Sequence, residues 1–272
     1  MKIELENINK CPLCGSDKYS LWKNINSWSI VFCDNCSLKR LNPRPSERYL
    51  AQLYSADYFE ERKPEDLNKA TRQMNRSFKR RYNSIRKFPN GRRLLDIGCG
   101  EGKWCLYIKN CGYNVTGIDI SAEASKLKDV KIIVGTIFER DFSEKYDVIT
   151  MFHCLEHMPD PVAALKKVNQ LLTDNGILVI EVPNSGSFDA IKYDADWEGW
   201  KLPYHLFHFD QKTLTRALNE NGFSPVYWRY DSSKWLRTKI KKIPIIKLFH
   251  GILSHLKTGT SMFVLCKKSH SL

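Results

Sequence analysis

The stretch LLDIGCGEG at residues 94–102 decides the fold, because a short apolar run changes there into three glycines and then into a helical pattern. This order predicts a buried strand, a tight turn and the N-terminus of a helix. Gly98, Gly100 and Gly102 allow positive φ angles and a close approach of the backbone to a ligand, and the first N–H groups of the helix point into the same space. We therefore predict a nucleotide-type cleft at this turn.

A second apolar run over residues 113–118 ends at Asp119. A carboxylate in this place can accept hydrogen bonds from both hydroxyls of a ribose. The glycine spacing is G-x-G-x-G, one residue short of the dinucleotide-binding G-x-G-x-x-G, so the sequence carries no pyrophosphate signature. The two runs together predict a nucleoside-binding cleft.

The glycine stretch resembles the first motif of the class I S-adenosylmethionine-dependent methyltransferases, (V/L)-L-D-(I/V)-G-C-G-x-G. The resemblance continues at GIDIS (117–121), at YDVI (146–149) and at LEHMPDP (155–161), and it covers roughly the last two thirds of the chain. It implies an α/β Rossmann-like fold with a seven-stranded, mostly parallel sheet whose last strand is antiparallel. The alternating patterns predict strands over 93–97, 113–118, 131–134, 146–151, 177–182, 223–230 and 262–267.

Helical patterns separate these strands. The sequence predicts helices over 102–110, 121–128 and 212–221, and a further helix that Asp160 caps and that ends at Asn175-Gly176. We divide the chain into a zinc ribbon (1–45), a helical linker or cap (46–90) and the S-adenosylmethionine-dependent methyltransferase domain (91–272).

Ligands of such sheets bind beyond the carboxyl ends of the strands. The resemblance therefore implies that the cofactor S-adenosylmethionine contacts residues at four strand ends. The methionine part is expected near Asp96, Gly98 and Gly100, and the ribose and adenine edge near Asp119 and Ile120. The remaining expected contacts are Thr136, Ile137, Phe138 and Phe152.

Four of the nine cysteines form an N-terminal metal motif. Cys11 and Cys14, and then Cys33 and Cys36, are spaced C-x2-C, eighteen residues, C-x2-C, as in a four-thiolate zinc ribbon. A module of about 40 residues has too small a core to fold unaided, so metal binding also supplies folding energy. We predict a structural Zn²⁺, and the alternative is a loop of unmetallated cysteines.

The fourth predicted strand ends in FHCLEH at residues 152–157. His153, Glu156 and His157 match the inverted zinc-protease pattern, but that motif belongs on a helix, and we reject it. The stretch also resembles E-x-x-E-H of the ubiquinone-pathway O-methyltransferases, where it is linked to a divalent ion, with His153 in place of the first glutamate. The simplest interpretation is that Glu156 and His157 order the loop beside the cofactor.

The stretch 183–210 follows the fifth strand without an obvious helix, and loops of this length usually carry function. Its pattern W-x-x-P-x-H-L-x-H-F resembles the segment that closes over the acceptor in bacterial methyltransferases of sugar and surface-glycan pathways. Of the candidate catalytic residues we prefer His205 as the base and place His153 second. His208 is expected chiefly to pack.

The net charge of +13 is concentrated in part between residues 62 and 93. Such a run can contact phosphates of RNA or of a nucleotide-linked substrate, and it can also be a solvated helix face. Residues 231–260 mix apolar residues with cations, which suits packing onto the domain or a second subunit, or peripheral contact with a membrane surface. The sequence leaves the oligomeric state open.

The sequence therefore predicts a methyltransferase that acts on a sugar hydroxyl of a nucleotide-linked or lipid-linked acceptor. The alternatives are an RNA base methyltransferase with a zinc module, and a non-enzymatic zinc-ribbon module on a degenerate methyltransferase fold. The sequence has no apolar stretch of about 18 residues and no signal pattern at its N-terminus, so we expect a cytoplasmic location, with the inner membrane face as a further candidate.

Overall fold

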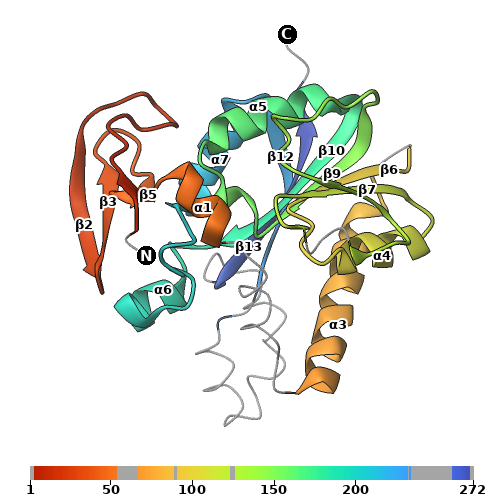
Figure 1. Ribbon diagram of the computed structural model, residues 1–272, viewed down its shortest axis with the longest axis horizontal. Coiled ribbons are helices and arrows are strands. Elements are labelled where there is room, and N and C mark those ends of the chain that lie inside the picture. The colour runs from red at the N-terminus through yellow and green to blue at the C-terminus, as the bar shows by residue number, and fades with distance from the viewer. Residues whose placement is uncertain are drawn as a thin grey trace.

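The computed structural model describes residues 3–53, 66–88, 91–122, 126–231, 233 and 259–269. Its main body is a seven-stranded sheet in the order β12-β13-β10-β9-β6-β7-β8 (Figure 1). The strand β13 runs antiparallel to both of its neighbours, and the remaining pairs are parallel. The predicted Rossmann-like sheet is thereby confirmed. Its strands are β6 (Arg93–Ile97), β7 (Asn114–Asp119), β8 (Lys131–Val134), β9 (Tyr146–Phe152), β10 (Leu172–Pro183), β12 (Phe223–Tyr230) and β13 (Ser261–Lys268).

Helices cover both faces of this sheet, because successive apolar side chains of a strand point to opposite sides. On β6, the fully buried Leu94 packs in the cluster formed with α3 (Leu67–Ile85) and α4 (Lys103–Asn110). The next residue, Leu95, packs in the cluster formed with α5 (Pro161–Leu171) and α7 (Gln211–Asn219). The sheet is therefore enclosed between two helical layers (Figure 1).

The N-terminal residues build a second sheet of four strands in the order β11-β4-β3-β2. Its strands are β2 (Tyr19–Ile25), β3 (Trp28–Cys33), β4 (Lys39–Leu41) and β11 (Phe207–His208). The fourth strand thus comes from the segment that follows β10. The hydrophobic cores of the two sheets are continuous, because Cys11 and Leu41 of the N-terminal region belong to the same buried cluster as Leu95 and Leu178 of the main sheet.

Short elements connect the two sheets. The strand β1 (Leu5–Glu6) pairs with β5 (Arg44–Pro45), and α1 (Glu47–Leu53) follows with Ser46 at its start, where the hydroxyl accepts a hydrogen bond from the Tyr49 amide. The stretch after β10, predicted to lack a helix, contains α6 (Phe188–Tyr193) besides β11. Two short 3₁₀ turns, η2 (Leu155–His157) and η3 (Asp194–Asp196), lie in the described stretch 126–231.

Helix boundaries follow from capping residues. Asp160 caps α5 as predicted, since its carboxylate accepts from the amides of Val162 and Ala163, but the helix ends at Leu171, and residues 172–175 already belong to β10. The predicted helix over 121–128 lies partly, and the mixed segment 231–260 mostly, outside the described residues. Within the described residues, no helix is both long and apolar enough to cross a membrane.

We predict that Asp210→Ala lowers the free energy of unfolding by about 1 kcal/mol, because Asp210 caps α7. Its carboxylate accepts a 2.8 Å hydrogen bond from the Thr213 amide, and the Thr213 hydroxyl accepts from the Asp210 amide in return. Urea denaturation would measure the change. Asp210→Asn is the matched control, since asparagine caps nearly as well, and equal midpoints for all three proteins would contradict this role.

Candidate functional site

A cavity of about 500 Å³ lies at the carboxyl ends of β6, β7, β8 and β9. Each strand end supplies part of its wall, and Glu47 of α1 adds a further side chain from the N-terminal region. The position is the one where parallel α/β sheets bind ligands. The lining consists of Glu47, Ile97, Gly98, Gly100, Ile118, Asp119, Ile120, Gly135, Thr136, Ile137, Phe138, Glu139, His153, Cys154, His157, Met158, Pro159 and Asp160.

The turn after β6 requires glycine for two reasons. Gly98 and Gly100 have φ angles of 73° and 52°, which most side chains avoid. A Cβ atom on Gly98 would also lie 2.6 Å from the Cys154 sulfur, so the neighbouring strand end leaves no room for it. The backbone amide of Gly100 donates a 2.7 Å hydrogen bond to Asp119 and thereby ties the turn to the end of β7.

Asp119 presents a fixed carboxylate at the cavity wall. One oxygen accepts from the Gly100 amide, and the other accepts from the Ser121 amide at 2.9 Å. Burial raises the pKa of this carboxyl above its ordinary value, against the opposite effect of the backbone hydrogen bonds. Beside it, Ile120 and Phe138 line the cavity with side chains that are 45% and 50% exposed, which suits an aromatic ring placed between them.

The segment after β8 contains an acidic cavity residue that was not predicted from the sequence. Glu139 lines the cavity, and its carboxylate accepts a 3.1 Å hydrogen bond from the Thr136 amide. A second hydrogen bond joins the same two residues, in which the Thr136 hydroxyl accepts from the Glu139 amide at 3.3 Å. The position three residues after a threonine is a common local hydrogen-bonding pattern, and this spacing was the available signal.

Two residues predicted to contact the cofactor lie behind the cavity wall instead. Asp96 is 3% exposed, and it accepts hydrogen bonds from Thr150 at 2.6 Å and from the Cys105 thiol at 3.4 Å. Phe152 packs between Trp104 and the Arg81 guanidinium, which lies 4.0 Å from the ring centre. The Asp96 side chain points into the sheet core, and the cavity is reached only by the residues that follow it, beginning at Ile97. Phe152 instead packs into the cluster of α3 and α4 on one face of the sheet.

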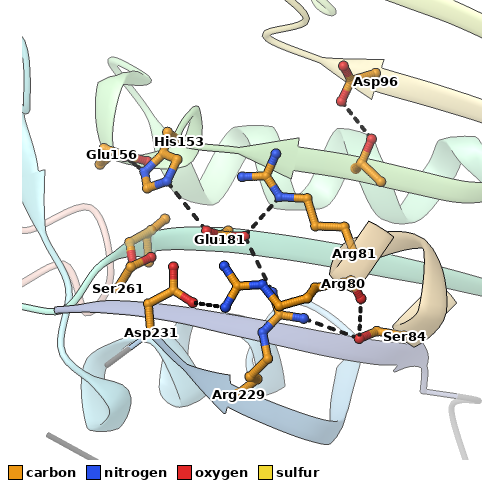
Figure 2. Close-up of polar contacts among 12 residues, drawn as sticks. Arg80, Arg81, Ser84, Asp96, His153, Glu156, Glu181, Arg229, Asp231 and Ser261 are labelled. Carbon is orange, nitrogen blue, oxygen red and sulfur yellow. Dashed lines mark hydrogen bonds and ion pairs between the residues drawn. The ribbon is translucent and has the colours of Figure 1, made fainter. Parts of the chain in front are cut away.

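His153 is the predicted catalytic histidine that lines the cavity, and its side chain is 45% exposed. Its ring lies between two buried carboxylates, with Nδ1 3.4 Å from Glu156 and Nε2 3.6 Å from Glu181 (Figure 2). Enclosure by protein alone would lower the pKa of this imidazole, but the two carboxylates outweigh it and raise the pKa to about 9. The backbone is held as well, since the His153 amide donates to the Glu181 carbonyl at 2.7 Å.

Glu181 joins this strand end to the helix α3 (Figure 2). Its carboxylate lies 3.0 Å from Arg81 of α3 and 3.8 Å from Arg229 of β12. Although burial would raise the pKa of Glu181, Arg81 and His153 hold that pKa far below its ordinary value. The carboxylate therefore stays charged and keeps α3 fixed against the sheet.

His205 and His208 do not line this cavity. Their side chains are buried, and burial lowers the pKa of His205 to about 4 and that of His208 well below its ordinary value. The His205 Nδ1 lies 2.8 Å from the Gly199 carbonyl, and His208 packs edge-on against Trp200. Residues 205–208 do not form the predicted acceptor-facing loop, because β11 pairs with β4 as a strand of the N-terminal sheet.

The four N-terminal cysteines converge as the spacing predicted. The four sulfur atoms all lie within 4.8 Å of one another. The sulfurs of Cys11 and Cys36 are 3.5 Å apart, as are those of Cys14 and Cys33. A zinc ion binds thiolates at about 2.3 Å, which places the four sulfurs of a tetrahedron about 3.8 Å from one another. The cysteines therefore fit a four-thiolate zinc site.

A nucleoside-sized cavity at the carboxyl edge of this sheet, with a glycine turn and a carboxylate on the next strand, defines a Rossmann-like cofactor-binding protein. Residues 70–227, more than half of the chain, match a family described as "Methyltransferase domain". The chain belongs to this methyltransferase family.

Known relatives agree with this assignment. The chain is 33% identical over 138 residues to the ubiquinone biosynthesis O-methyltransferase of Glaesserella parasuis serovar 5 (strain SH0165), which is 44% of this chain and 58% of that protein. It is 30% identical over 132 residues to the (S)-tetrahydroprotoberberine N-methyltransferase of Eschscholzia californica, or 42% of this chain and 37% of that protein. The matched region thus spans about half the length of such relatives.

Solved structures share the fold. A Burkholderia thailandensis 1,6-didemethyltoxoflavin-N1-methyltransferase, with bound 1,6-didemethyltoxoflavin and S-adenosylhomocysteine, superposes with a TM-score of 0.54 and 17% identity, over 93% of this chain and all of that chain. The magnesium protoporphyrin IX methyltransferase of Synechocystis PCC 6803 with bound SAH gives 0.55 and 15%, over 82% of this chain and all of that chain.

We predict that the buried Asp96 makes the free energy of unfolding depend on pH. Burial raises its pKa from 3.8 to about 6, so between these pH values the folded state holds a proton that the unfolded state has released. The free energy of unfolding contributed by Asp96 must therefore fall as the pH rises through this window. Asp96→Asn should gain on the order of 2–3 kcal/mol relative to wild type between pH 4 and pH 8. Urea midpoints at both pH values test this, and a difference that does not change with pH would contradict it.

Asp119 generates a prediction for ligand affinity. We expect Asp119→Ala to weaken binding of S-adenosylmethionine by about 1–3 kcal/mol, because the variant loses a charged acceptor for the ribose hydroxyls. Titration calorimetry would measure it. The matched control is Asp174→Ala, which removes an aspartate whose side chain is 78% exposed. Equal affinities for Asp119→Ala and Asp174→Ala would refute the ribose contact.

Proposed function

We propose that the protein transfers the methyl group of S-adenosylmethionine to a hydroxyl of a small molecule. The observation that carries this proposal is the cavity in which the glycine turn, Asp119 and the exposed Ile120 and Phe138 form one wall, while His153 forms another. A cofactor whose ribose is bound at Asp119 and whose adenine lies between the apolar side chains would extend its methionine part past Gly98 toward His153. The sulfonium methyl would then face the end of β9.

The acceptor proposed is a sugar hydroxyl, in a nucleotide-linked or lipid-linked molecule. The support is the resemblance of the segment 200–209 to methyltransferases of glycan pathways, together with relatives that are named for methyl transfer to oxygen or nitrogen of small molecules. Positioning of the acceptor in line with the methyl group would supply most of the rate enhancement.

The residue proposed to contact the acceptor is His153. It lies at the cavity, whereas His205 and His208 are 4% exposed and lie outside the lining. Two carboxylates and a backbone hydrogen bond fix the imidazole and keep it protonated, so the ring would present a rigid, positively charged surface against which an acceptor can be positioned. The geometry thus favours His153 over His205, which the sequence pattern had favoured.

The four cysteines are proposed to bind a structural Zn²⁺. With all four ligands supplied by thiolates, the ion would have no open coordination position, and its contribution would be to the folding of residues 1–45.

A labelled-methyl assay tests the proposed reaction. Purified protein would be incubated with labelled S-adenosylmethionine and either a panel of glycosides and nucleotide sugars or total RNA. We expect label in a small hydroxyl acceptor. Stoichiometric label in RNA would overturn the acceptor class, and failure to bind S-adenosylmethionine at all would favour the non-enzymatic alternative.

His153→Ala is expected to lower turnover of that acceptor by roughly 10²-fold, the size of effect that misplacement of a reacting group produces, because the variant loses the protonated ring that lies at the cavity between Glu156 and Glu181. Affinity for S-adenosylmethionine should stay near that of wild type, because the groups assigned to the ribose and adenine are untouched. Steady-state kinetics and calorimetry on His153→Ala and on the control Asp174→Ala separate the two effects. Full turnover by His153→Ala would exclude the assignment.

A further inference from the structure

Behind the cavity wall lies a carboxylate, that of Glu156, for which the described residues offer no hydrogen-bond donor within bonding geometry. Glu156, in the turn η2, is 1% exposed, and within the part of the chain that the structure describes neither of its side-chain oxygens has a hydrogen-bond partner. Burying a carboxylate without donors costs several kcal/mol unless another charge compensates it. The nearest cationic group is His153, whose Nδ1 lies 3.4 Å from Glu156, whereas Glu181 also faces Arg81 and Arg229. Among the described residues, the Glu156 carboxylate therefore has imidazoles alone around it and no arginine.

Two further histidines meet this carboxylate from different segments. His157 adjoins Glu156 in η2, and His205 comes from the stretch before β11. The His205 Nε2 is 3.9 Å from a Glu156 oxygen, and the two imidazole rings are 4.6 Å apart at an angle of 82°. One potential ligand atom from each of the three residues lies within 4.8 Å of the others.

The histidines are oriented as metal ligands commonly are. The Nδ1 of His205 lies 2.8 Å from the Gly199 carbonyl, and the Nδ1 of His157 lies 2.9 Å from the Tyr204 carbonyl. A carbonyl can only accept, so Nδ1 carries the hydrogen in both rings and Nε2 keeps its lone pair. Backbone carbonyls fix the tautomer of zinc-ligating histidines in the same way.

We propose that Glu156, His157 and His205 bind a divalent cation of the zinc class, at a second site separate from the four cysteines. Two imidazoles and one carboxylate are a ligand set that zinc adopts with a further position open. The ion neutralises Glu156 and cross-links the end of β9 to the stretch that leads into β11. His153 is not a ligand of this site: the ligand atoms that all lie within 4.8 Å of one another come from Glu156, His157 and His205, and the His153 Nε2 faces Glu181.

The ligand set distinguishes this site from a strand-end triad of His153, Glu156 and His157. In the proposed site the third ligand comes from a segment about 50 residues further along the chain, and no local motif contains it. The two arrangements predict opposite results for two single substitutions, His153→Ala and His205→Ala.

Metal analysis of the full-length protein tests the proposal. After saturation with Zn²⁺ and removal of excess metal, we expect wild type and His153→Ala to retain about two equivalents, and Glu156→Gln and His205→Ala about one. Glu156→Gln keeps the size of the side chain, and circular dichroism would confirm that each variant is folded. One equivalent in wild type, or loss of the second ion in His153→Ala but not in His205→Ala, would overturn the site.

Cobalt substitution provides an independent readout. Co²⁺ bound to the four cysteines gives intense sulfur-to-metal charge transfer, whereas Co²⁺ on two imidazoles and a carboxylate absorbs weakly in the visible range and has no such band. We expect both spectra in sequence during titration of the metal-free protein, and the thiolate spectrum alone in Glu156→Gln. Identical titrations of wild type and Glu156→Gln would contradict the proposal.

Discussion

The pairing of β11 with β4 is the interaction on which the remaining arrangement depends. Phe207 and His208 extend the N-terminal sheet, and just before them the Leu206 carbonyl accepts from the Leu41 amide at 2.9 Å. On its other side the Leu206 amide donates to the Glu156 carbonyl, also at 2.9 Å. One residue therefore bridges the N-terminal sheet and the turn η2 that follows β9 at the cavity.

Arg44 makes a second connection between the N-terminal region and the cavity. The Arg44 side chain, which is 7% exposed, pairs with Glu6 at 2.8 Å and donates a 2.7 Å hydrogen bond to the carbonyl of Pro159, a residue of the cavity lining. The N-terminal region also contributes Glu47 to that lining. Because the Arg44 contacts are partly buried and join different segments, Glu6, Arg44 and Glu47 of the N-terminal region form part of the cavity's support. They are not an appendage to it.

The sequence was sufficient for the sheet, because apolar runs and glycines are local signals: the predicted strands over 93–97, 131–134 and 223–230 match β6, β8 and β12 residue for residue. It was also sufficient for the convergence of the cysteines, whose spacing is itself a geometric constraint. It could not place His205, because that depends on β11 pairing with a strand about 165 residues earlier, and no local pattern encodes this pairing. The sequence also could not show that the Asp96 side chain points inward, because its hydrogen-bond partner Thr150 lies on another strand.

The half-exposed Ile120 and Phe138 have a thermodynamic consequence. Large apolar side chains that line a cavity are hydrated until a ligand covers them, and their dehydration lowers the heat capacity of the system. The heat released on binding a nucleoside in this cavity should therefore grow as temperature rises. In the proposed complex, hydrogen bonds to Asp119 would fix the position of the ligand, and the dehydration of Ile120 and Phe138 would make the binding enthalpy depend on temperature.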